Sequence, residues 1–124
     1  MVFVIVGVGI DVVGIERFAA CLRRAPRLAE RLFTDSEIGL PVESLAARFA
    51  AKEALAKALD SPGNLAWRDA EVLRPTGEGK TAAGPRLAVY RTVARRCEEL
   101  GVVHLHVSLS HDAGQATALV IAEA

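Results

Sequence analysis

The hydrophobic pattern predicts strands at both ends of the chain. Residues 2–11 are rich in valine and isoleucine without regular polar positions, as is typical of a strand buried on both faces. Residues 102–110 alternate apolar and polar side chains and residues 116–121 are again apolar, so the two segments are predicted to form a hairpin around the turn HDAGQ. A further strand is expected over residues 67–74.

Helical signals fill the middle of the chain. The sequence TDSE at residues 34–37 has the form of a capping box and predicts a short helix that Pro41 ends. The other predicted helices span residues 15–24, 42–59 and 87–100, the last closed by Gly101. Together these elements indicate an α+β fold in a single domain over residues 1–124.

The long predicted helix carries charges that do not gather on one face. In the stretch RFAAKEALAKAL, Arg48, Lys52, Glu53 and Lys57 fall between apolar neighbours when residues are placed about 100° apart. No face is left purely polar, so the helix is expected to be covered nearly all round. A covered carboxylate such as Glu53 needs a cation nearby.

Composition adds three limits. The chain has 124 residues, of which 52% are hydrophobic and 5% aromatic, an apolar excess that hints at partner subunits. Fifteen basic residues balance fifteen acidic ones, which argues against a nucleic-acid binder. Cys21 and Cys97 have no CxxC spacing and are expected to be reduced.

The apolar opening residues are too few to cross a membrane, so a cytoplasmic protein without membrane attachment is expected.

A local excess of arginine follows the first strand. Its members are Arg17, Arg23, Arg24, Arg27 and Arg31, against the single acid Glu30. The stretch is either an ordinary solvated helix face or a docking surface for an acidic partner, because arginine suits carboxylate recognition.

Asp11 ends the first predicted strand on the same face as Gly7 and Gly9, which leave room for a ligand or another backbone. The Asp11 carboxylate could cap the next helix, and Glu53 could pair only with Lys57 four residues on. Alternatively, the two carboxylates together with substrate phosphates form a typical Mg²⁺ site.

The strand HLHVSLSHD places His104, His106, Ser108 and Ser110 on one side. Three histidines without fitting cysteine or glutamate spacing make a poor zinc site. The consecutive Ser110, His111 and Asp112 make a poor catalytic triad. His106 alone is interpreted as a structural histidine.

Five segments in order resemble one family. GVGIDVVGIERF, FTDSEI, RFAAKEALAKAL, WRDAEV and HVSLSHD are similar to the holo-[acyl-carrier-protein] synthases, the small 4′-phosphopantetheinyl transferases. The resemblance implies that family's fold, a small antiparallel sheet packed on a long central helix. It also implies Mg²⁺-dependent transfer of the 4′-phosphopantetheine arm of coenzyme A to a serine of apo acyl carrier protein, releasing adenosine 3′,5′-bisphosphate. A homotrimer with coenzyme A at the subunit interfaces is expected.

The resemblance also implies site residues. Asp11 and Glu53 match metal-binding carboxylates, and both are expected to act in catalysis together with Lys57. The positions expected to bind coenzyme A are Arg48, Lys52, Lys57, Ser61, Gly63, Pro85 and His111. Arg17, Arg23, Arg24 and Arg27 are expected to dock the acidic carrier protein. Two loops depart from the family pattern, because DSPG is less glycine-rich and TGEGKTAAG is longer than the usual Asn-Gly-Lys-Pro.

Two other functions fit parts of the pattern. A GID sequence at a strand end together with a helical glutamate suits an RNase H-like metal-dependent nuclease. A non-catalytic trimer that binds coenzyme A is the second alternative.

Overall fold

The computed structural model describes residues 3–74 and 84–124. Its elements follow in chain order as β1 (Ile5–Gly14), α1 (Ile15–Arg24), α2 (Leu28–Leu32), α3 (Val42–Ala58), the 3-10 helix η1 (Trp67–Asp69), β2 (Ala70–Leu73), β3 (Arg86–Val89), α4 (Arg91–Leu100), β4 (His104–Asp112) and β5 (Gln115–Glu123). The α+β class and the long central helix are confirmed.

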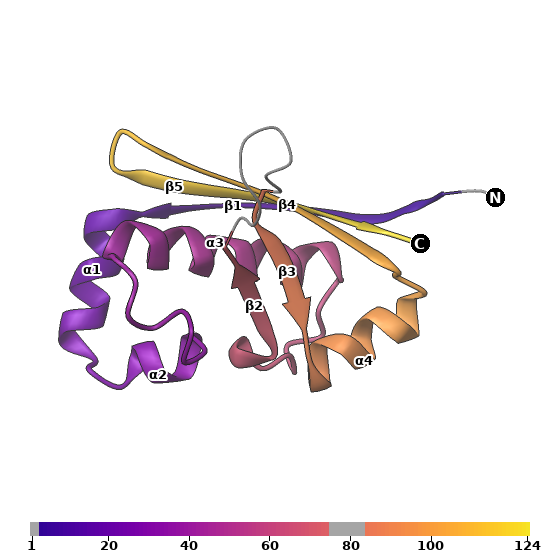
Figure 1. Ribbon diagram of the computed structural model, residues 1–124, viewed down its shortest axis with the longest axis horizontal. Coiled ribbons are helices and arrows are strands. Elements are labelled where there is room, and N and C mark those ends of the chain that lie inside the picture. Colours follow the sequence, from indigo (N-terminus) through magenta and orange to yellow (C-terminus); the bar gives the residue numbers. More distant parts are fainter. Residues whose placement is uncertain (1–2, 75–83) are drawn as a thin grey trace.

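An antiparallel sheet in the order β1-β5-β4 covers one side of α3 (Figure 1). On its other sides, α3 is flanked by α1 and α2 near its start, and by the β2-β3 hairpin and α4 further along. The inward positions of β5 are Ala116, Ala118, Val120 and Ala122, all fully buried. Small side chains at these positions let the helix lie close to the sheet.

Two glycines of β1 set the distance between the sheet and α3. A Cβ atom added to Gly7 would lie 1.9 Å from the carbonyl oxygen of Ala58, and one added to Gly9 would lie 1.8 Å from that of Ala54. Only glycine fits at such separations. The room that the sequence predicted on this face is therefore filled by the backbone of α3.

The far side of α3 holds a buried ion pair. Lys52 Nζ donates to Glu37 Oε1 and to the carbonyl oxygen of Leu32, each at 2.7 Å, and to that of Trp67 at 3.2 Å. Glu37 Oε2 accepts from the backbone of Val72 at 2.9 Å. The ion pair thus connects α3 to α2 and the turn at Glu37 on one side, and to η1 and β2 on the other.

Three sequence predictions about local structure were wrong. The segment at 34–37 makes the capping contact from the Thr34 amide to Glu37 Oε1, at 3.0 Å, but continues as turns because Glu37 turns inward to Lys52. The helix of this region is α2, which precedes the motif. The helix predicted from Leu87 begins only at Arg91, because residues 86–89 pair with β2. Most of the loop TGEGKTAAG lies outside the described residues.

The third correction concerns β1, which is not buried on both faces within the chain. Its outward side chains Val8, Ile10 and Val12 are 54%, 57% and 51% exposed. They pair across the sheet with Ile121, Leu119 and Thr117 of β5. In the part of the chain that the structure describes, no helix has the length and apolarity to cross a membrane.

Candidate functional site

The end of β1 meets the last turns of α3 at a charged cluster. Lys57 Nζ donates to Asp11 Oδ1 at 3.1 Å and to the carbonyl oxygen of Ile10 at 2.9 Å. The close packing at Gly7 and Gly9 makes this contact possible, because Asp11 lies on the same face of β1 as the glycines.

Glu53 lies one helical turn before Lys57 and completes the cluster. Burial raises the pKa of the Glu53 carboxyl, the negative charge of Asp11 raises it further, and Lys57 lowers it only in part. The two carboxylates therefore repel each other, and a bound cation would relieve the repulsion. The sequence prediction that Asp11, Glu53 and Lys57 act together is consistent with this geometry.

A shallow hollow opens at this cluster, lined by Glu53, Ala56, Lys57, Asp60 and Ser61. Asp60 adds a third carboxylate that the sequence reasoning missed, because its position one residue beyond the helix carries no periodic signal. Among residues 3–74 and 84–124, no three His, Cys, Asp or Glu side chains form a group that could hold a metal. A metal here would need oxygen ligands from a substrate, and the two carboxylates suit Mg²⁺, which takes few protein ligands.

The loop after α3 has a defined shape. Gly63 adopts φ 95°, a left-handed conformation that favours glycine, and its amide donates to Ser61 Oγ at 3.1 Å. This contact turns the loop back over the end of the helix. Ser61 lines the hollow of Lys57, and Gly63 follows it two residues on in the same loop.

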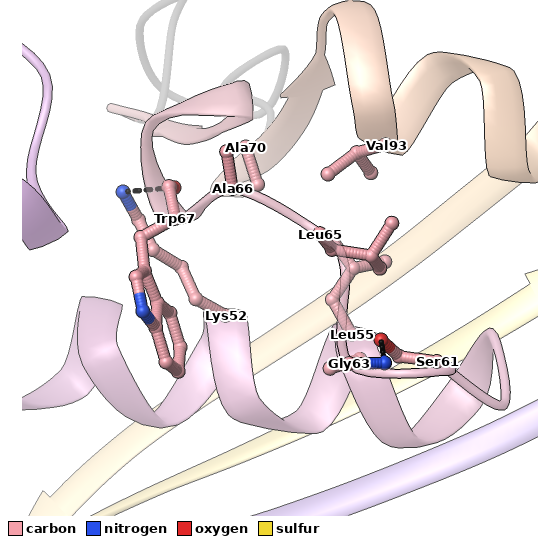
Figure 2. Close-up of a pocket in the computed structure, with 10 residues that line it drawn as sticks. Lys52, Leu55, Ser61, Gly63, Leu65, Ala66, Trp67, Ala70 and Val93 are labelled. Atoms are coloured by element: carbon pink, nitrogen blue, oxygen red, sulfur yellow. Dashed lines mark hydrogen bonds between the residues drawn. The ribbon is translucent and has the colours of Figure 1, made fainter.

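A second cavity of about 230 Å³ adjoins this loop. Figure 2 shows Ser61 and Gly63 at one end of it, Lys52 and Trp67 at the other, and apolar side chains between them. The apolar lining consists of Leu55, Ala56, Leu65, Ala66, Trp67, Ala70 and Val93. It can accommodate an apolar group next to the charged hollow.

Two predicted basic residues lie away from the cluster. About 100° per residue places Lys52 some 140° around α3 from Lys57, and its ammonium already has three acceptors within the chain. Arg48 is 8% exposed, and its Nε is buried with no acceptor among the described residues. Burial lowers the pKa of Arg48, Arg74 lowers it further, and Glu37 opposes both. Their contacts with coenzyme A stay predictions.

The structure places the remaining predicted binding residues elsewhere. His111 is exposed in a hollow that also contains Glu16, Glu43 and Asp112, and it does not line the hollow of Lys57. Pro85 is partly buried directly before β3. His106 Nε2 lies 3.3 Å from Glu123 Oε1, in agreement with a structural histidine.

The arginine-rich stretch lies on the surface of α1, the turn that follows and α2. Its five members are all exposed, namely Arg17, Arg23, Arg24, Arg27 and Arg31. Phe18 faces inward from the same helix and stacks on Phe49 with ring centroids 5.2 Å apart. The helix is therefore anchored on one side and cationic on the other.

Comparisons with known proteins show which family the chain is similar to. The model of the 4′-phosphopantetheinyl transferase superfamily matches residues 7–120. The holo-[acyl-carrier-protein] synthase of Streptomyces griseus is 60% identical, with 96% of this chain and 98% of the relative covered. The synthase structure from Neisseria meningitidis has a TM-score of 0.80 at 29% identity, covering 96% of this chain and 98% of that one. A coenzyme A complex of the Chronobacterium ammoniagenes synthase has a TM-score of 0.77 at 29% identity, covering 98% and 97%.

Proposed function

Because the chain belongs to the 4′-phosphopantetheinyl transferase superfamily, we propose that it transfers the 4′-phosphopantetheine arm of coenzyme A to a serine of apo acyl carrier protein. The observation that carries the proposal is the convergence of Asp11, Glu53 and Lys57 beside a hollow. The names of the relatives and the coenzyme A complex of one of them support the substrates. Neither the nuclease nor the non-catalytic trimer finds support in the matches.

The reaction replaces the phosphoanhydride bond within the pyrophosphate of coenzyme A by a phosphate ester bond to the carrier serine. The carrier serine Oγ bonds to the β-phosphorus of coenzyme A, and the bond from that phosphorus to the bridging oxygen breaks. Adenosine 3′,5′-bisphosphate leaves with the bridging oxygen. In such transfers positioning and charge neutralisation supply most of the catalysis.

Lys57 is proposed to neutralise charge on the pyrophosphate. Its side chain is 54% exposed and lines the hollow, while Asp11 accepts a hydrogen bond from its ammonium group. A cation held by the protein stabilises negative charge that develops on the leaving oxygen. Ser61 and Gly63 are proposed to contact the nucleotide beside it.

Asp11 and Glu53 are proposed to hold Mg²⁺ together with pyrophosphate oxygens. When bound, Mg²⁺ supplies neutralisation and orientation of the phosphates. Burial raises the pKa of Glu53 and the negative charge of Asp11 raises it further; the repulsion between the two carboxylates supports this assignment, since a cation relieves it. Glu53 is also proposed to accept the proton of the carrier serine.

A homotrimer is proposed to cover the outward face of the sheet. Val8, Ile10 and Val12 expose an apolar strip on β1 next to Leu119 of β5. Such a strip on a single chain is typical of a subunit interface. The proposed trimer is also expected to bring His111 of one subunit to the nucleotide of the next, because His111 lines a hollow separate from that of Lys57.

The exposed face of α1 is proposed as the carrier-protein dock. Arg17, Arg23 and Arg24 lie on this helix and Arg27 follows it. Carrier proteins are acidic in the family that the chain resembles, and arginine pairs with carboxylates through two parallel hydrogen bonds.

A cytoplasmic location is proposed from the cysteines. Cys21 and Cys97 are both free thiols, as the reducing cytoplasm favours.

Intact-mass spectrometry tests the proposed reaction. The purified protein is mixed with coenzyme A, Mg²⁺ and an apo acyl carrier protein, and the carrier is weighed. We expect a mass gain equal to one phosphopantetheine arm, lost with EDTA and with Glu53→Gln. Full turnover by Glu53→Gln would remove both roles proposed for this residue, and no gain with any apo carrier protein would overturn the function.

A further inference from the structure

The end of α3 adopts a conformation that its own residues disfavour. The Ser61 amide donates to the carbonyl oxygen of Ala56 at 3.0 Å and the Asp60 amide to that of Lys57 at 3.1 Å, which is the Schellman pattern. This pattern needs a left-handed residue after the cap, and glycine is usual there. Here the position is occupied by Asp60, with φ 47°. The turn therefore carries backbone strain and needs support from outside the helix.

Arg96 of α4 provides that support. Its Nε donates to the carbonyl oxygen of Leu59 at 2.9 Å and its Nη2 to that of Asp60, also at 2.9 Å. The Arg96 side chain is 20% exposed and its remaining contact is Glu99 at 3.2 Å. The guanidinium thus holds two consecutive carbonyl groups at the negative end of the helix dipole, where a cation is favoured.

The turn that Arg96 holds lies between Lys57 and Ser61, which are proposed to contact the phosphates and the nucleotide. Lys57 is three residues before Asp60, and Ser61 is the next residue after it, with both side chains lining the same hollow. A change in the peptide planes of residues 59–60 would rotate Ser61 away from Lys57. It would also break the hydrogen bond from the Gly63 amide to Ser61 Oγ, which holds the loop in its observed conformation.

We infer that Arg96, a residue outside the predicted site, is a positioning residue for the nucleotide of coenzyme A. It acts through the strained turn at Asp60, holding Ser61 and Gly63 where they meet the nucleotide while Lys57 meets the phosphates. The inference rests on the proposed function, because it assumes that coenzyme A occupies this hollow. Arg96 does not itself touch the reacting atoms, and its effect is expected on coenzyme A binding rather than on the carrier protein.

The test compares Arg96→Ala, Arg96→Lys and Arg95→Ala. Arg95 is the exposed neighbour on the same helix and serves as the matched control. For each variant, steady-state transfer gives kcat and the KM for coenzyme A and for the carrier, and calorimetry gives the Kd of coenzyme A. Hydrogen exchange of the Asp60 and Ser61 amides reports the turn directly.

Arg96→Ala is expected to raise KM and Kd for coenzyme A about tenfold, or about 1.4 kcal/mol, with the KM for the carrier unchanged. The two amides should exchange faster while those of β5 keep their protection. Arg96→Lys should recover only part of the affinity, because an ammonium group cannot hold both carbonyls in a fixed fork. Arg95→Ala should match the wild type.

Two results would overturn the inference. One is an unchanged Kd for coenzyme A in Arg96→Ala, and the other is an equal loss for coenzyme A and carrier together with faster exchange throughout the fold. A wild-type protein that neither binds coenzyme A nor modifies a carrier would instead overturn the proposed function. The two failures are therefore distinguishable.

Discussion

The ammonium group of Lys57 lies 3.1 Å from the carboxylate of Asp11, which joins two residues that are 46 positions apart. The side chains are 54% and 20% exposed, respectively. A half-exposed ion pair contributes only about 0–1 kcal/mol to stability. The contact therefore adds little to the stability of the fold. Its main effect is to place the Lys57 ammonium group beside the carboxylates of Asp11 and Glu53.

Replacement of Lys57 by alanine is expected to slow transfer about 10²- to 10³-fold, because one charge that stabilises the leaving oxygen is lost. The melting temperature should change little, since the ammonium group is half exposed. Intact-mass kinetics measures the rate, and Lys57→Arg is the control that keeps the charge. A turnover within twofold of the wild type in Lys57→Ala would contradict its proposed role.

Replacement of Gly9 by alanine is expected to destabilise the fold by about 3 kcal/mol or more, because the new Cβ would lie 1.8 Å from the carbonyl oxygen of Ala54. The sheet must then move away from α3 and separate Asp11 from Lys57. Urea unfolding measures the loss. Gly39→Ala is the matched control, since nothing lies within 4 Å of its Cβ position; equal stability of the two variants would refute the close-packing argument.

The buried pair Glu37–Lys52 is expected to show strong coupling. Glu37→Gln or Lys52→Met alone leaves a buried charge without its partner, which costs about 3–5 kcal/mol. The double variant should lose less than the sum of the single losses, because no charge remains unpaired. A double-mutant cycle by denaturant unfolding measures this, and additive losses would mean that the two groups do not interact in solution.

Asp69 predicts how stability depends on pH. Burial raises its pKa, but hydrogen bonds from the Thr92 hydroxyl and amide and the charge of Arg91 outweigh burial, so the folded-state pKa lies below 3.8. A carboxyl group whose pKa is lower in the folded state than in the unfolded state stabilises the fold at pH values above the unfolded-state pKa. This stabilisation is lost as the pH falls through the folded-state pKa. Stability should therefore drop as pH falls through 3.8 and below.

Asp69→Asn is the companion variant, because it removes the charge and one acceptor at the start of α4. It should lower the free energy of unfolding at neutral pH by about 1 kcal/mol, the usual value for a helix cap. Its stability should then fall less steeply in acid, as chemical denaturation at several pH values would show. Parallel pH profiles for the two proteins would exclude this role of Asp69.

Ile10→Glu is expected to yield monomers, because it places a charge in the middle of the apolar strip of β1. Light scattering after size-exclusion chromatography measures the mass. Val103→Glu is the control, because Val103 is 69% exposed but lies outside the apolar strip. It directly precedes β4 and is on the same face as Leu105. A wild-type monomer would contradict the proposed homotrimer, and a trimer that persists in Ile10→Glu would locate the interface elsewhere.

Local sequence signals predicted the elements whose residues interact mainly with near neighbours. The 15–24 helix, the long helix and the final hairpin all lie close to their expected positions, because a helical period or a strict alternation identifies them without distant contacts. The strand Arg86–Val89 was missed since it depends on pairing with β2 across the loop. The helix predicted from the capping motif at residues 34–37 does not form, because Glu37 is buried in an ion pair with Lys52.

The sequence by itself determined the class of the fold, and it predicted a site for metal and phosphate from the residue types of the short motifs that hold Asp11, Glu53 and Lys57. Only the tertiary structure decided which of the predicted cations are enclosed within the chain and which are open to solvent. Lys52 and Lys57 are nearly equivalent in sequence, yet one is enclosed by Glu37 and the other faces the hollow. Arg96 carries no local signal at all, because its partners are two carbonyl groups that only the packing of α4 on the end of α3 brings within reach.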